Sequence, residues 1–182
     1  HAVLNLWISY YFQGDANYAV GEYSDAQTLL ARARQEHCKD KDEAWRLACN
    51  LDSIGVNEMA LEDYEQAEQC LLCALELKKK HLGEASRFVP VTLNHLGDLY
   101  YVTGHADKAK GYYRQALELT EKDQLNLEVC RALNGLALIH NDAGEQVEAE
   151  ELLKRAQDIH ERHLRRWHPY LATVCERRRW RS

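Results

Sequence analysis

The sequence has little proline, with two residues among 182. Proline removes a backbone donor and interrupts helices, so its scarcity suits an all-helical protein. The chain also lacks any run close to the roughly 20 apolar residues that span a bilayer, which predicts no membrane insertion. Positive charge is not in excess, because 23 Lys and Arg oppose 29 Asp and Glu to give a net charge of −6. That balance argues against binding to nucleic acid, which needs a concentrated basic face.

Catalytic motifs are lacking as well. The chain contains no glycine–lysine phosphate loop, no G-x-S-x-G and no H-E-x-x-H. Cys70 and Cys73 form a C-x-x-C pair inside a helical pattern, and no second pair lies nearby to complete a tetrahedral metal site. His160, His163 and His168 gather near a helix end, where the helix dipole favours surface histidines. We therefore expect no enzyme activity, no metal and no cofactor.

What the sequence does contain is a repeat of two helices joined by a turn. The second helix of each copy carries two alanines seven residues apart: Ala26 and Ala33, Ala67 and Ala74, Ala109 and Ala116, Ala149 and Ala156. The first alanines of successive pairs are 40 to 42 residues apart. Before each second helix stands a turn residue: Gly21, Glu62, Gly104 or Gly144. Such a fixed period predicts an array of similar units rather than an irregular helical domain.

Small residues also recur in the middle of each first helix: Gly14, Gly55, Gly97 and Ala137. Two antiparallel helices can approach closely only where small side chains face each other at the crossing. Large apolar residues such as Leu93 and Leu96 recur at i, i+3, as one face of a helix requires. A single hairpin cannot bury its apolar face alone, so the copies are expected to stack into a solenoid.

These residues resemble the tetratricopeptide repeat. The period is longer than the usual ~34 residues, and the linkers LELKKKHLGE and DIHERHLRRWHP are similar to those of the kinesin light chain variant. The resemblance implies an all-α, right-handed solenoid of stacked antiparallel hairpins, in one domain over residues 1–182. The expected repeats span residues 7–38, 48–80, 90–121 and 130–161.

The two ends of the array differ from the middle. A final helix over 169–180 is expected to begin at Pro169 and to cap the array, although Arg178 and Arg179 replace an apolar and a small residue. At the other end, Trp7 and its neighbours make the first helix apolar around most of its circumference. We expect this helix to pack on further repeats, on a second copy or on a partner, because end repeats normally show a polar outer face.

The resemblance further implies that the first helices line a concave surface that takes an extended peptide or a helix. The residues expected on it are Tyr11, Phe12, Asp15, Tyr18, Asp52, Ser53, Asn94, His95, Asp98, Tyr101, Arg131, Asn134 and Asn141. Asparagine both donates and accepts, so Asn94 and Asn134 suit a peptide backbone, with hydrogen bonds inside the solenoid as the alternative. For the aromatic residues of the first repeat, the alternative is packing against a neighbouring helix.

Carboxylates outnumber Arg131 on this surface, which favours a basic or apolar partner segment. The sequence therefore predicts a protein-binding adaptor or scaffold. The alternative is a constitutive subunit of a larger assembly that uses its apolar N-terminal helix as the contact.

Six cysteines lie scattered at apolar helical positions, which is typical of a reducing compartment and favours the cytoplasm. The chain begins with His1 rather than Met, so a targeting signal could lie upstream.

Overall fold

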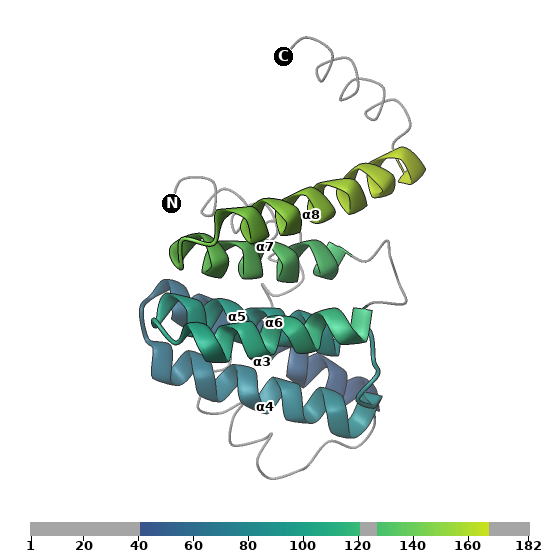
Figure 1. Ribbon diagram of the computed structural model, residues 1–182. Coiled ribbons are helices and arrows are strands. Elements are labelled where there is room, and N and C mark those ends of the chain that lie inside the picture. Colours follow the sequence, from purple (N-terminus) through teal and green to yellow (C-terminus); the bar gives the residue numbers. More distant parts are fainter. Residues whose placement is uncertain (1–40, 121–126, 168–182) are drawn as a thin grey trace.

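The computed structural model describes residues 41–120 and 127–167 (Figure 1). The expected repeat over 7–38, with Tyr11, Phe12, Asp15 and Tyr18, lies outside the described residues. So does the expected final helix over 169–180.

The described chain is all helical and forms three antiparallel hairpins, stacked one above another in Figure 1. The helices are α3 (Lys41–Ala60), α4 (Tyr64–Leu82), α5 (Val89–Val102), α6 (Ala106–Thr120), α7 (Leu127–Asp142) and α8 (Gln146–Trp167). Within each hairpin the two helices contact each other extensively, and each hairpin then contacts the next. The prediction of an all-α solenoid is confirmed.

The turn between the two helices of each hairpin has the same left-handed backbone. Glu62, Gly104 and Gly144 have φ angles of 66°, 79° and 80°. The amide of the next residue then donates back to a carbonyl of the first helix, at 2.9, 2.8 and 2.9 Å. This pairing satisfies carbonyls that a helix C-terminus would otherwise leave open. Two of the three turns use glycine, which adopts positive φ without steric cost, and one uses glutamate.

The helices run further than the expected repeat bounds. α3 begins at Lys41 rather than near residue 48, with Asp42 and Glu43 in its first turn, where negative charge favours the helix dipole. α8 continues to Trp167 rather than ending near residue 161. α4 shows the contrast, because it ends at Leu82 directly before Gly83, which has a φ of 92°. No glycine or proline follows Gly144 until Pro169, so nothing breaks α8 earlier.

The core lies between the hairpins and depends on close approach. Ala67, Ala109 and Ala116 are fully buried where the second helices cross their neighbours. At Gly55 a Cβ atom would lie 2.7 Å from Cγ of Leu71, so α3 and α4 meet where no side chain intervenes. As predicted, small residues stand where the helices approach each other most closely.

The first helices α3, α5 and α7 contact one another across successive hairpins. Among the described residues, the second helices α4, α6 and α8 make no such contact with each other. The array is thus tighter on the side of the first helices, and that side is its inner wall. The predicted groove residues of α3, α5 and α7 all belong to this wall.

Candidate functional site

Three of the residues expected on the inner wall are buried rather than open to a peptide. The exposed fractions are 6% for Asp52, 0% for Asn94 and 7% for His95. Each faces a neighbouring helix of the array, because the helices of the inner wall lie close enough to cover one another.

Asp52 lies in a buried polar cluster that joins α3, α4 and α5. Its carboxylate forms an ion pair with Lys78, which is 2% exposed. The Lys78 ammonium also donates to Oγ1 of Thr92 at 2.9 Å, and Thr92 donates to Oδ2 of Asp52 at 3.1 Å. Nδ1 of His95 is 3.8 Å from Oδ1 of Asp52, which is too long for a hydrogen bond. The cluster ties one repeat to the next.

The electrostatics of this cluster favour the charged carboxylate. Burial alone raises the pKa of Asp52, but the charge of Lys78 and the nearby His95 outweigh it and hold that pKa below its usual range. A buried ion pair of this kind needs both partners, since either one alone would be an uncompensated charge.

Asn94 forms hydrogen bonds within the solenoid, which is the alternative that the sequence left open for it. Its Nδ2 donates to the backbone carbonyl of Glu128 at 3.0 Å and to the Glu128 carboxylate at 2.8 Å. Both bonds cross from α5 to α7. With no exposed surface, Asn94 is used in joining two first helices and is not presented to a peptide.

Asp98 and Arg131 form an ion pair across α5 and α7, with side chains 30% and 23% exposed. The hydroxyl of Tyr113, from α6, donates to the other Asp98 oxygen at 2.6 Å. Burial would lower the pKa of Arg131, but the charge of Asp98 outweighs it and raises that pKa. Burial, followed by the charge of Asp98, raises the pKa of Tyr113, so its hydroxyl stays protonated as a donor. The Asp98 charge is therefore largely neutralised.

Tyr101 and Asp142 form the outermost bridge between α5 and α7. The Tyr101 hydroxyl donates to Oδ2 of Asp142 at 2.7 Å. Burial, together with this bond to a carboxylate, raises the pKa of Tyr101 to about 12. Because the donor is neutral, Asp142 keeps its negative charge, and it is exposed.

The remaining expected residues are at least partly accessible. Ser53 is half-buried and donates to the carbonyl of Cys49 at 3.1 Å, within its own helix. Asn134 is half-buried and Asn141 is exposed, both on α7. Leu138 of α7 is likewise half-buried. The name inner surface is used below for the accessible residues of the inner wall on α5 and α7, which are Tyr101, Arg131, Asn134, Leu138 and Asn141.

Sequence reasoning missed several residues that hold the inner wall in shape. They are Lys78, Thr92, Tyr113, Glu128 and Gly135. A signal was present for Gly135, because a glycine stands two residues before the repeated small position Ala137, and Tyr113 replaces the leucine that the other second helices carry at its position. The polar partners carried no such signal, since each bond joins residues from different helices.

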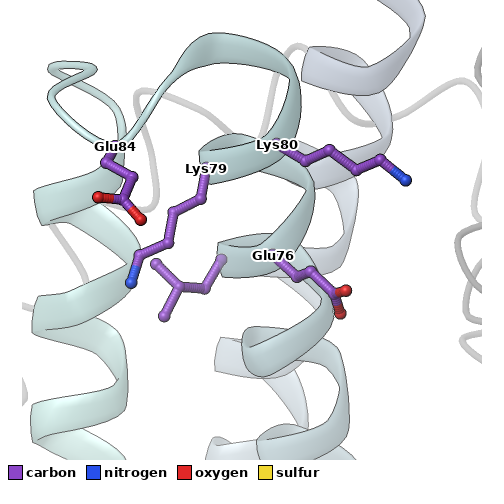
Figure 2. Close-up of a pocket in the computed structure, with 5 residues that line it drawn as sticks. Glu76, Lys79, Lys80 and Glu84 are labelled. Carbon is purple, nitrogen blue, oxygen red and sulfur yellow. The ribbon is translucent and has the colours of Figure 1, made fainter.

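Elsewhere, the described surface has a shallow depression, but its side chains are not arranged to bind a defined ligand. Leu75, Glu76, Lys79, Lys80 and Glu84 line a shallow depression near the C-terminus of α4. Figure 2 shows Lys79 and Glu84 on one side of it, and Glu76 and Lys80 extending away on the other. The charges of this lining are balanced and open to solvent, which gives no preference for a charged ligand.

No group of three or more His, Cys, Asp or Glu in the described ranges is arranged to hold a metal ion. None of the described helices is both long and apolar enough to cross a bilayer.

Comparison with known proteins agrees with the geometry. Residues 46–122 and 129–170 match family models described as tetratricopeptide repeat. Among solved structures, the chain is similar to the one described as BtubC (BKLC) from P. vanneervenii, with 26% sequence identity and a TM-score of 0.57. The similar region covers 63% of this chain but only 46% of that chain. A comparison with curated proteins finds no match.

Proposed function

Because the chain belongs to the tetratricopeptide-repeat family, we propose that it is an adaptor or scaffold whose inner surface binds a segment of a partner protein. Tetratricopeptide repeats generally mediate protein–protein interactions, and proteins built from them are typically non-enzymatic. The observation that carries the proposal is the inner surface itself. It combines an aromatic, an aliphatic and two amide side chains with Arg131, whose charge is paired with Asp98. Hydrogen bonds between α5 and α7 hold these neighbouring helices in place.

The chemistry of the inner surface favours an apolar segment with a positive charge at one end. Asp52 is paired with Lys78, and Asp98 with Arg131, so these carboxylates contribute less attraction for cations than their number suggests. Asp142 retains its charge beside Tyr101. Leu138 offers apolar area, and Asn134 and Asn141 can donate to and accept from a peptide backbone. A basic residue of the partner would therefore lie near Asp142, with apolar residues over Leu138.

The inner surface is also prepared for binding before a partner arrives. Bonds from Asn94 to Glu128 and from Tyr113 to Asp98 fix α5 and α7 relative to each other. A partner segment then orders mainly itself, which reduces the entropic cost of association. A cytoplasmic location is part of the same proposal, and it is supported by Cys70 and Cys130, which are buried in the helices as free thiols.

A random-peptide display library tests the proposal, followed by measurement of dissociation constants for the selected peptides. The test variants are Leu138→Asp and Asn134→Arg. The matched control is Gln115→Arg, at an exposed position of α6 on the second-helix side. We expect apolar, singly basic peptides to be selected, and each test variant to weaken them at least about tenfold, or roughly 1.4 kcal/mol.

The control variant should bind as wild type does, and circular dichroism should show that all variants are folded. Equal binding by wild type, both test variants and the control would place the working surface elsewhere. Attention would then pass to the alternative of a constitutive subunit that docks through residues before Lys41.

A further inference from the structure

The three hairpin turns carry the most exposed large apolar side chains of the described residues. Leu61 is 74% exposed, Val102 50% and Val147 68%, whereas the other exposed large apolar side chains of the described ranges are 38–49% exposed. Each hairpin contributes one of the three, and in Figure 1 the three turns lie on one side of the stack, at the left. The repeat-equivalent residues of the three turns are here called the turn edge: 58–65, 100–107 and 140–147.

The repeat itself does not require these three apolar residues. Their equivalents in the other two hairpins are small or polar: Thr103 and Ala143 for Leu61, Ala60 and Asp142 for Val102, and Glu65 and Asp107 for Val147. Stacking of the hairpins therefore proceeds without an apolar side chain at any of these positions. Single exposed apolar residues are common on protein surfaces, but apolar side chains grouped over neighbouring elements mark an interaction site.

The turn edge is also acidic. Its three ranges contain four, one and two carboxylates, and no lysine or arginine. Six of these carboxylates are exposed: Glu62, Asp63, Glu65, Asp107, Asp142 and Glu145. Among the described residues, the one ion pair that they form joins Glu145 to His140. Lys108 stands one residue beyond the turn edge, and its ammonium lies over the ring of Tyr100. Most of the negative charge is therefore uncompensated.

Helix dipoles explain only part of this charge. Glu65 and Asp107 lie in the first turns of α4 and α6, where a negative charge is stabilising. Asp142 is the last residue of α7, and Glu62 follows the end of α3, so both lie at helix C-termini, where a negative charge is unfavourable. These two carboxylates are retained at a cost to the helices, which favours a role in binding.

We propose that the turn edge binds a basic, apolar segment of a partner protein, as a second contact surface beside the inner surface. Charge complementarity selects this occupant, because the carboxylates attract lysine and arginine and repel nucleic acid and anionic lipid. Neighbouring helices pack roughly 8–10 Å apart, so the first and third turns are separated by roughly 20 Å. An extended segment needs at least about six residues to cross that distance.

A second copy of this chain is the competing occupant, and its charges fit less well. The edge opposite the turns includes the linker over residues 79–87, which has three basic residues, Lys79, Lys80 and Arg87. Glu76 and Glu84 lie beside them and balance most of that charge. A separate basic segment therefore complements the turn edge better than a second copy does.

The test measures dissociation constants of labelled peptides for the full chain by fluorescence anisotropy. The probe is the seven-residue peptide KLKLKLK, and KSKSKSK is the comparison with equal charge and no apolar side chain. We expect KLKLKLK to bind at least about tenfold more tightly than KSKSKSK. Leu61→Ser combined with Val147→Ser should remove most of this difference. The matched control is Leu72→Ser combined with Leu153→Ser, two exposed leucines outside the turn edge, and it should bind as wild type does.

A second pair of variants tests the charge at constant net charge. Glu65→Gln with Asp107→Asn should weaken KLKLKLK several-fold and reduce the loss of affinity as salt is added. Glu76→Gln with Glu118→Gln removes the same charge from exposed positions toward the other ends of α4 and α6, and it should have little effect. Circular dichroism should show that all variants are folded.

Equal binding of KLKLKLK and KSKSKSK, or equal losses in the test and control pairs, would overturn the proposal, because a specific apolar contact would be lacking. A loss of binding in Leu138→Ser alone would also overturn it and assign the peptide to the inner surface. Sedimentation of wild type as a dimer that Leu61→Ser with Val147→Ser dissociates would overturn it as well and assign the turn edge to a second copy.

Discussion

The ring of Tyr113 occupies the space that a side chain at Gly135 would need. A Cβ atom built at Gly135 lies 2.7 Å from Cε1 of that ring, and one at Gly97 lies 2.7 Å from Cδ1. Tyr113 thus passes between α5 and α7, with glycine on both sides, and its hydroxyl reaches Asp98 at 2.6 Å. The corresponding residue of α4 is the smaller Leu71, and its repeat has only one such glycine, Gly55.

Gly135→Ala should therefore destabilise the protein by about 1–3 kcal/mol, since a rigid ring cannot yield to the added methyl group without shifting a helix. Adding Tyr113→Leu should recover part of this loss by restoring space, although it removes the bond to Asp98. Urea denaturation followed by circular dichroism measures both. The matched control is Gly111→Ala, where an added Cβ meets nothing within 4 Å. An equal loss for the alanine variants at 111 and 135 would show that helix packing is not the cause.

Glu62→Gly should stabilise the protein. Glu62 has a φ of 66°, where its two equivalents are glycines. A left-handed conformation costs a residue with a Cβ about 1–2 kcal/mol, and glycine recovers this at an entropic cost of about 0.5–1 kcal/mol. We expect a net gain of up to about 1 kcal/mol and a higher Tm in differential scanning calorimetry. The reciprocal change Gly104→Glu should lower the Tm, and a gain there would contradict the account.

Lys78→Met should destabilise the protein strongly, by about 3–5 kcal/mol, because it leaves the Asp52 carboxylate buried without a cation. Replacing both partners, as Asp52→Leu with Lys78→Met, should cost much less, since no buried charge is left. A double-mutant cycle from urea unfolding gives the coupling between the two residues. Additive losses from the two single variants would show that the ion pair is not coupled.

The Asp52 carboxylate should account for part of the loss of stability at acid pH. The pKa of Asp52 is lowered in the folded state, so its ionised form adds stability above its unfolded pKa of about 3.9. That stability is lost as the pH falls through the folded pKa. Asp52→Asn should therefore flatten the decline in unfolding free energy below about pH 4, while lowering stability at neutral pH. If the unfolding free energy of this variant falls below pH 4 as steeply as that of wild type, other carboxylates cause the decline.

Cys70 should be inert toward thiol reagents despite its C-x-x-C spacing. Burial, with a smaller effect from the charge of Glu58, raises the pKa of Cys70 to about 11, and the side chain is 0% exposed. Only about 0.1% of it would be thiolate at pH 8. Site-resolved alkylation should label the partly exposed Cys73 first, and Cys70 only after unfolding. Equal labelling of both in the native protein would contradict the described burial.

The sequence by itself determined the fold of this protein. Helices that must pack closely are predicted by the repeat spacing, by the paired alanines and by Gly55 and Gly97 in the middle of their helices. The sequence is enough for this prediction because each of these signals is local. The sequence also predicted the turns at Gly104 and Gly144, because glycine is common directly after a helix. The structure adds that both glycines have a left-handed backbone. These features depend only on neighbouring residues and on the period.

Only the tertiary structure decided which polar residues of the first helices are accessible. Asp52, Asn94 and Asn134 share one position in the repeat, yet the first pairs with Lys78, the second with Glu128, and the third is half-buried. Helical periodicity gives the direction in which a side chain points, but not what a helix some 40 residues away places against it. The charge of the inner surface depended on those distant partners, so its chemistry could be read only after the helices were packed together.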